Sequence, residues 1–258
     1  MKMIWISPAF LKWDICASLR TRVSATVTSR PYAMLDHGED LLRHHVGELF
    51  RVDAILTMKR ALDLRLKRLN RLYAFDRLCG KEIPKHLIQK LEYCNIIRPL
   101  MVRKLLDLRN VLEHQQKIPP PVDRCEEFLE FVWYFLRSTD WITSASIDRI
   151  QYEHPRYKQN YGIECWKSHD WTFRLNAWLP ATMVSQSPRR DWLHLAVSEI
   201  RTRREMRQAM TKKEVRELPE KRDDRGRDPD DCFVRMLVKM VHESTSYQQL
   251  VREYFRAH

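Results

Sequence analysis

Nine residues decide the fold class of this chain: Trp171-Thr172-Phe173-Arg174-Leu175-Asn176-Ala177-Trp178-Leu179. Apolar side chains occupy the odd positions and mostly polar ones the even positions, which is the two-residue period of a strand with one buried face. A shorter alternating run, Tyr161, Ile163 and Cys165, precedes it, and Ser168-His169-Asp170 predicts the turn between the two. We therefore expect a small β-containing module at residues 145–200.

The end of that module can be interpreted in two ways. Ser187-Pro188 is typical of a helix start, whereas Leu193, Leu195 and Val197 alternate as in a strand. The sequence alone leaves both structures open for residues 192–200.

Upstream, the apolar residues recur every three or four positions instead, which predicts helices. The expected helices are 39–77, 84–96, 99–116 and 123–138. Gly80 follows the first as a C-terminal cap, and Pro119-Pro120-Pro121 stops the third. Short connections between helices favour a four-helix bundle over residues 39–138.

The remaining ranges complete an α+β protein that is mostly helical. Residues 1–38 are expected to be an N-terminal arm, a short strand pair, or an extension ahead of a start at Met34. Residues 201–230 are densely charged with both signs and predict a solvated helix running into a linker. Residues 231–258 predict a C-terminal amphipathic helix through apolar positions such as Phe233, Leu237 and Phe255.

Charge is the strongest compositional signal. Lys and Arg total 46 against 34 Asp and Glu, which gives a formal net charge of +12. A surface with that excess attracts anions, of which nucleic acid is the commonest macromolecular example. A basic protein without an anionic ligand remains the simpler alternative.

Cysteine usage and hydropathy indicate a cytoplasmic protein. The six cysteines are scattered and form neither a C-x-x-C pair nor a zinc-finger spacing, as expected for reduced thiols. No apolar run has the length of a membrane span, and Lys12 and Asp14 interrupt any signal-like segment. We expect no membrane partner, no metal and no cofactor.

The segment Leu105-Leu106-Asp107-Leu108-Arg109-Asn110-Val111-Leu112-Glu113-His114 gathers three groups that suit phosphodiester cleavage. Asn110 and His114 are four residues apart on one helical face, with Arg109 at its edge. Arg binds a phosphate and offsets charge in the transition state. His, with an unperturbed pKa of about 6.5, exchanges protons near neutral pH. RNA supplies its own nucleophile, the 2′-hydroxyl. The alternative is a structural one, in which His114 interacts with the helix dipole.

The same residues resemble the HEPN family of helical ribonuclease domains. That family carries an Arg followed by Asn, Asp or His, and then a His that closes an R-x4-6-H spacing on the third helix. Arg109, Asn110 and His114 match it, as does the leucine-rich approach from Lys104 to Leu108. The likeness covers residues 39–138.

The resemblance implies a homodimer in which two motifs form one cleft that cleaves RNA, leaving a cyclic phosphate and a 5′-hydroxyl. It also implies a toxin, an antiviral defence effector or an RNA-processing enzyme acting on tRNA or mRNA, restrained by an inhibitory or trigger partner. Some toxin members carry a Tyr two residues after the His. Here that position is Gln116, which departs from the pattern.

Further residues are candidates for holding RNA. They are Arg65, Arg68 and Arg71 in a basic run, Lys104 beside the motif, and Trp178 on the strand as a stacking platform. A solvated helix face explains the basic run equally well. The rival function is a non-catalytic RNA-binding or assembly protein that keeps the helices for dimerisation.

Overall fold

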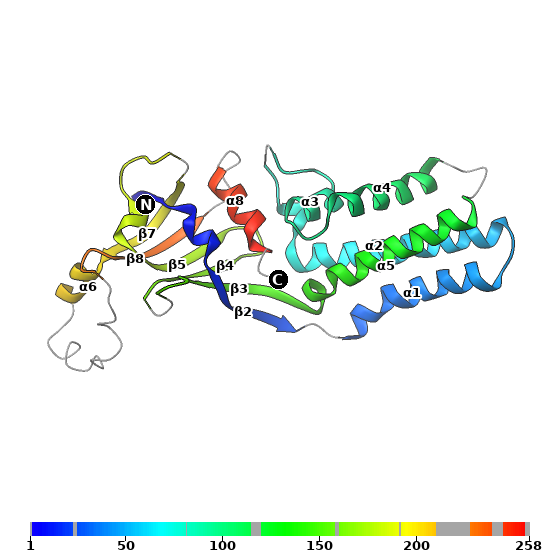
Figure 1. The fold of residues 1–258 in the computed structure, drawn as a ribbon, viewed down its shortest axis with the longest axis horizontal. Helices are drawn as coiled ribbons and strands as arrows, with labels where there is room; N and C mark the ends of the chain where they lie inside the picture. The colour runs from blue at the N-terminus through cyan, green and yellow to red at the C-terminus, as the bar shows by residue number, and fades with distance from the viewer. Residues whose placement is uncertain are drawn as a thin grey trace. The chain divides into compact units, whose positions relative to one another are not determined.

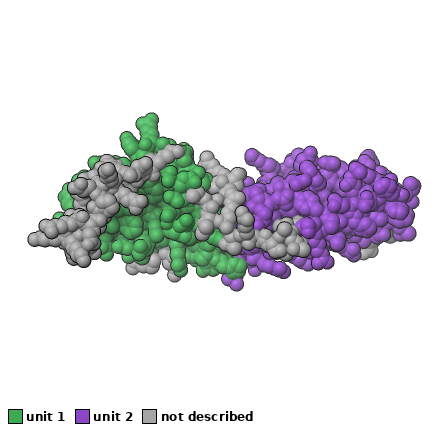
Figure 2. All heavy atoms as spheres, turned by 90° about the horizontal axis from the view of Figure 1, so that it is seen from below, with its two compact units in different colours: residues 1–20, 147–258 green, residues 21–146 purple. Residues whose placement is uncertain are grey.

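The chain forms two compact units. A computed structural model describes residues 2–22, 25–80, 82–114, 120–157, 160–190, 192–209, 228–238 and 245–255. Residues 1–20 and 147–258 make up the sheet unit, and residues 21–146 make up the helical unit (Figures 1 and 2). The helical unit is thus inserted in the sequence of the sheet unit.

The sheet unit is built on one eight-stranded sheet of order β2-β3-β4-β5-β8-β7-β1-β6. Its strands are β1 (Lys2–Ile6), β2 (Asp14–Arg22), β3 (Ala145–Glu153), β4 (Gly162–Lys167), β5 (Phe173–Leu179), β6 (Val184–Ser185), β7 (Leu193–Thr202) and β8 (Cys232–Val238). The predicted hairpin is confirmed, because β4 pairs antiparallel with β5 and places Cys165 opposite Leu175. Residues 193–202 form strand β7.

One face of this sheet carries the core of the unit. On β5 the odd positions Phe173, Leu175, Ala177 and Leu179 are buried, as the alternation predicts. Helix α8 (Thr245–Tyr254) packs on this face, with the Tyr254 ring 5.4 Å from that of Phe173. The short 3₁₀ helix η1 (Pro8–Lys12) adds Phe10, whose ring meets Tyr152 of β3 at 6.3 Å.

The helical unit contains α1 (Ala25–His44), α2 (Glu48–Tyr73), α3 (Leu87–Tyr93), α4 (Pro99–His114) and α5 (Val122–Ser144). Helices α1, α2 and α5 pack against one another, and α4 packs on α5 and α2 (Figure 1). Their apolar sides bury residues such as Met58, Leu69, Phe128 and Phe135. This unit therefore has a core of its own.

The expected HEPN-like four-helix bundle at residues 39–138 is wrong, although the chain is α+β. Five α-helices lie between residues 25 and 144 in the described part of the chain. The predicted helix 39–77 is divided at Gly47, whose φ of 139° is incompatible with a continuous helix. Helix α1 also begins well before residue 39, and α5 continues beyond residue 138 to Ser144.

The expected N-terminal arm and C-terminal helix also differ from the structure. Residues 1–38 contribute β1, β2 and the first part of α1. Residues 231–258 contribute strand β8 before helix α8, because Val234 and Met236 alternate into the sheet core between β5 and β7. In the charged range 201–230, β7 ends at Thr202 and α6 spans Arg203–Ala209, while residues 210–227 lie outside the described part.

Candidate functional site

Helix α4 carries the predicted catalytic residues Arg109, Asn110 and His114. Its backbone is helical through His114, so Asn110 and His114 are one turn apart. Leu105 is fully buried against the unit, whereas Asn110 is exposed. The side chains of Arg109 and His114 lie outside the described part of the chain.

Ion pairs join α4 to α5 two to five residues before the motif. Glu127 of α5 accepts hydrogen bonds from Lys104 of α4 and from Arg124. Arg124 also lies 3.7 Å from Asp107 of α4. The hydrogen bond from Lys104 is the largest cause of the lowered pKa of the Glu127 carboxyl. These contacts hold α4 in place, and they engage Lys104, which we expected to contact RNA.

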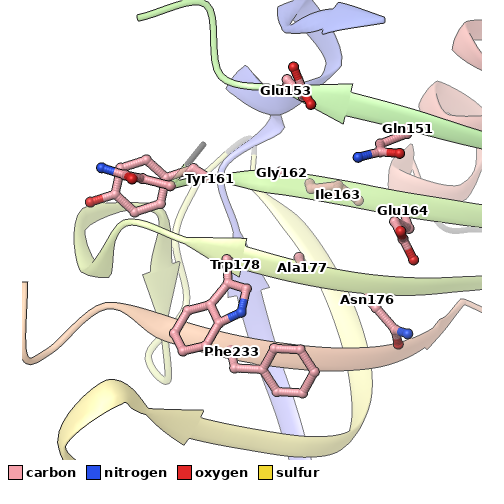
Figure 3. A pocket seen from close by; sticks show the side chains of 11 residues that line it. Gln151, Glu153, Tyr161, Gly162, Ile163, Glu164, Asn176, Ala177, Trp178 and Phe233 are labelled. Atoms are coloured by element: carbon pink, nitrogen blue, oxygen red, sulfur yellow. The ribbon is translucent and has the colours of Figure 1, made fainter. Parts of the chain in front are cut away.

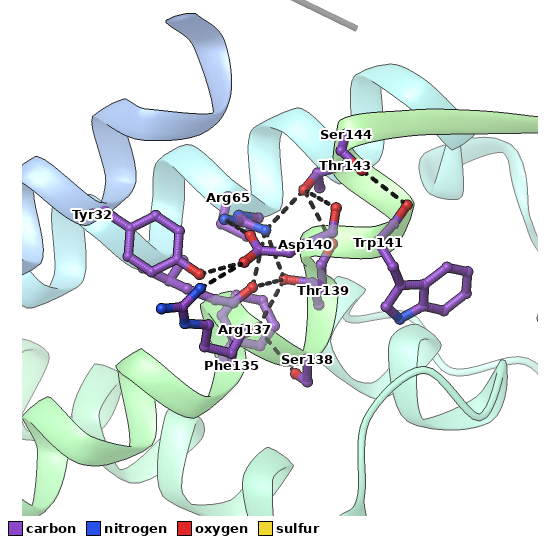
Figure 4. Close-up of polar contacts among 11 residues, drawn as sticks. Tyr32, Arg65, Phe135, Arg137, Ser138, Thr139, Asp140, Trp141, Thr143 and Ser144 are labelled. Carbon is purple, nitrogen blue, oxygen red and sulfur yellow. Dashed lines mark hydrogen bonds and ion pairs between the residues drawn. The ribbon is translucent and has the colours of Figure 1, made fainter. Parts of the chain in front are cut away.

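Arg65, another expected RNA contact, is buried inside the helical unit and is corrected to a structural residue. Only 1% of its surface is exposed. Its Nη1 donates hydrogen bonds to the Leu136 carbonyl at 3.1 Å and to the hydroxyls of Thr139 and Thr143 at 3.1 and 2.8 Å (Figure 4). Its Nη2 donates to Asp140 Oδ1 at 2.8 Å. A phosphate cannot reach this guanidinium.

The same cluster extends to helix α1. Tyr32 donates its phenolic hydrogen to Asp140 Oδ2 at 2.6 Å, and the Arg65 guanidinium lies 5.8 Å from the centre of the Tyr32 ring (Figure 4). Burial, followed by the hydrogen bond to Asp140, raises the pKa of Tyr32 to about 12. The cluster thus connects α1, α2 and α5.

The other two basic candidates on α2 differ in exposure. Arg68 is half-buried, and its pKa is lowered by desolvation and then by the nearby charge of Arg71. Arg71 is exposed. Of the three arginines predicted on this helix, Arg71 is the one best placed for an anion in solvent.

Trp178 lies on the sheet face opposite the core of the sheet unit. Its ring centre is 5.5 Å from that of Phe233 on β8, and the two rings lie side by side at the edge of a hollow (Figure 3). The hollow has a volume of about 320 Å³. Gly162 is the β4 partner of Trp178, so the neighbouring position on β4 brings no side chain against the indole.

Phe233 was missed as a candidate because residues 231–258 were interpreted as a helix. The signal that could have found it is the alternation of buried Cys232, Val234 and Met236 with Phe233 and Arg235. A strand with that pattern directs Phe233 and Arg235 away from the core.

Among the residues that the structure describes, no group of three or more His, Cys, Asp or Glu side chains is placed to hold a metal ion. Within the same residues, no helix has the length and apolar character needed to cross a membrane.

Comparison of the chain with protein-family models, with curated proteins and with solved structures finds no match. The candidate sites therefore stand on the residues and geometry of this chain alone.

Proposed function

We propose that this protein is an endoribonuclease that cleaves RNA without a metal ion, using residues on helix α4. One observation carries the proposal: Arg109, Asn110 and His114 share an unbroken helix on which Asn110 is exposed and the buried Leu105 lies on the side away from Asn110 and His114. A guanidinium, an amide and an imidazole within two turns supply the charge stabilisation, hydrogen bonding and proton transfer that can cleave a phosphodiester.

The reaction needs no nucleophile from the protein. His114 takes the proton of the RNA 2′-hydroxyl, and O2′ attacks the adjacent phosphorus. The bond from phosphorus to the 5′-oxygen of the next nucleotide breaks, and that oxygen takes up a proton. The products are a 2′,3′-cyclic phosphate and a 5′-hydroxyl. Arg109 offsets the charge that develops on the phosphate oxygens, and Asn110 orients the phosphate by hydrogen bonding.

Pairing of two chains belongs to the proposal. One imidazole serves as base or as acid in a given turnover, and a second copy of the chain would supply the other. Sedimentation equilibrium of the purified protein tests this part separately, because a monomer at the concentrations used for cleavage would contradict it.

The net charge of +12 supports an anionic substrate. A ribonuclease of this kind harms the cell that makes it, which fits a toxin or a defence effector held in check by a partner or a trigger. Growth of cells that express the wild type, compared with cells that express His114→Ala, tests this role.

The direct experiment incubates end-labelled tRNA and mRNA with protein in excess EDTA. We expect the wild type to leave cyclic-phosphate ends and His114→Ala to cleave at least about a hundredfold more slowly. His37→Ala, which removes an exposed histidine from helix α1, is the matched control and should cleave normally. Equal cleavage by the wild type and His114→Ala would contradict the site assignment.

A second function, RNA binding without cleavage, is favoured by the hollow beside Trp178 and Phe233. Aromatic rings on an open sheet face bind bases by stacking and require no reacting group. In that case His114→Ala would leave both RNA affinity and any effect on growth unchanged. Intact RNA with the wild type, together with measurable binding, would favour this second function.

A further inference from the structure

The face of the sheet away from its core carries cations and aromatic rings in register. On β5, Arg174, Asn176 and Trp178 occupy the even positions, and none of them is buried. Strand pairing places Arg174 beside Trp166 of β4 and places Trp178 beside Phe233 of β8. About 13 Å separates Arg174 from Trp178, at the usual rise of a strand.

A hollow of about 760 Å³ lies at the Arg174 end of this face. Trp166, Lys167, Arg174, Ser198 and Arg235 are among the residues that line it. The side chains of Arg174 and Arg235 are cationic, that of Trp166 is an indole, and none of the lining residues is a carboxylate. That chemistry is complementary to a phosphate attached to a flat ring. Lys167 pairs with the inward-facing Phe173, and its ammonium lies 4.4 Å from the centre of the buried Trp171 ring, so its charge belongs to the core side of the sheet.

The cations of this hollow differ in how far they are already neutralised. Arg235 pairs with Glu199 at 3.4 Å. Arg174 is exposed and pairs with no carboxylate among the described residues. Its guanidinium is therefore the one that would gain most from a bound phosphate.

The smaller hollow beside Trp178 continues the same surface, since Asn176 lines both. Here the lining includes Glu153 and Glu164 in addition to the rings of Trp178 and Phe233 (Figure 3). Carboxylates repel phosphate but accept hydrogen bonds from the amino groups of bases. The hollow at Arg174 is thus cationic, whereas the hollow at Trp178 is suited to bases.

We propose that this face of the sheet, from Trp166 and Arg174 to Trp178 and Phe233, binds single-stranded RNA. A phosphate lies against Arg174, and a base of the same strand stacks on Trp178. The inference rests on the proposed function for the choice of RNA as the polymer, but the surface lies in the sheet unit, whereas the reacting groups lie on α4 of the helical unit. Binding here selects or holds the substrate.

The test uses the full chain and a fluorescein-labelled 2′-O-methyl oligoribonucleotide of mixed sequence. This probe has no 2′-hydroxyl to attack its phosphates, so fluorescence anisotropy measures binding without cleavage. We expect Trp178→Ala to raise Kd about tenfold, because the stacking of a base is lost. We expect Arg174→Gln to raise Kd and to reduce the slope of log Kd against log salt concentration by about one.

Arg43→Gln is the matched control, because it removes one exposed arginine from helix α1 and lowers the net charge equally. Its affinity should equal that of the wild type. The inference is overturned if Arg174→Gln and Trp178→Ala bind as the wild type does, or if Arg43→Gln weakens binding as much as Arg174→Gln. It is also overturned if heparin, which has no bases, binds as tightly and is equally unaffected by Trp178→Ala.

Failure of this inference is distinct from failure of the proposed function. His114→Ala should bind the 2′-O-methyl probe normally whether or not the chain cleaves RNA. Conversely, if the protein cleaves RNA but its Kd is insensitive to Arg174→Gln and Trp178→Ala, the site on α4 is supported and the binding face of the sheet is contradicted.

Discussion

Asp140 holds two partners from different helices, and this makes it a key residue of the helical unit. One carboxylate oxygen accepts a hydrogen bond from Arg65 of α2 at 2.8 Å, and the other accepts one from Tyr32 of α1 at 2.6 Å. Asp140 itself lies on α5 and is about one-third exposed. Charge-assisted hydrogen bonds of this kind contribute most where solvent is partly excluded.

Because the pKa of Tyr32 is raised, the contribution of this cluster to stability depends on pH. Since the phenol has a pKa of about 12 in the folded protein and of 10.0 when unperturbed, its contribution to stability is complete below pH 10. Between pH 10 and 12 the unfolded state loses the phenolic proton before the folded state does. Stability is therefore lost as the pH rises through this window.

Tyr32→Phe should lower the free energy of unfolding by about 1 kcal/mol at pH 9, because Asp140 is partly exposed and the lost hydrogen bond is screened by solvent. The difference between the two proteins should shrink above pH 10, where the wild type alone loses the contribution of this phenol. Urea unfolding at pH 9 and at pH 11 measures it. A difference that grows with pH would contradict the assignment of the raised pKa to Tyr32.

Arg65 illustrates why single residues were the hardest to predict. In the sequence it belongs to a run that includes Lys67, Arg68 and Arg71, all of which look like one basic face. Which arginine points inward depends on Thr139, Thr143 and Asp140, more than 70 residues further along the chain. No pattern of residues close in the sequence predicts that pairing.

At the scale of elements, the break between α1 and α2 depends on Gly47. Its φ of 139° lies in a region that residues with a Cβ avoid, whereas the 3.7 Å from an added Cβ to Phe50 would be an ordinary contact, so the backbone angle alone opposes a side chain here. The periodicity of apolar residues on both sides of this position is helical, which is why the sequence predicted one long helix. A single backbone angle divides it in two.

Gly47→Ala should lower the free energy of unfolding by about 1–2 kcal/mol, because the alanine must adopt a strained backbone conformation. Gly38→Ala is the contrasting variant: Gly38 lies inside α1, and its added Cβ would make an ordinary contact with the Ala54 carbonyl oxygen at 3.4 Å. That variant should be neutral or more stable by up to about 1 kcal/mol, since alanine favours helix. Equal losses in the two variants would show that the angle at Gly47 is not the cause.

Strands were predictable where one period alone fitted the residues. Phe173 to Leu179 alternate over their whole length, and the strand, its hairpin and the outward position of Trp178 all followed from that pattern. In β8, Phe233 and Leu237 also fit a helical spacing, so the sequence did not distinguish the two structures. The sheet resolves the ambiguity by placing β8 between β5 and β7.

At the scale of the whole molecule, the candidate chemistry and the candidate binding face belong to different units. Helix α4 lies in residues 21–146, and the strands with Arg174, Trp178 and Phe233 lie in the sheet unit. Each unit has its own buried core. The sequence predicted helices followed by strands, but not that the first residues of the chain complete the sheet, because pairing between β1 and β7 is a long-range contact.

Replacing residues 23–144 by an Asn-Gly turn should therefore leave a folded sheet unit, since β2 and β3 are neighbours in the sheet and Asn-Gly favours a tight hairpin. We expect this protein to bind the 2′-O-methyl probe with a Kd within about threefold of the full chain, because the stacking and phosphate contacts remain. It should not cleave RNA. Circular dichroism measures whether the sheet unit is folded, and fluorescence anisotropy measures its Kd for the probe. Retained cleavage would place the reacting groups in the sheet unit.

The insertion of one unit between neighbouring strands also imposes an order on folding. Before β2 can pair with β3, the chain must close a loop that contains the entire helical unit, and the entropic cost of closure grows with loop length. Helices form quickly because their contacts are local, whereas pairing between distant strands is slow. Helices α1 to α5, once folded, replace that long loop by a compact connection. During synthesis, β1 and β2 leave the ribosome before β3 and β7, and they remain unpaired until those strands are made. Early folding of the helical unit therefore shortens the time for which β1 and β2 remain unpaired.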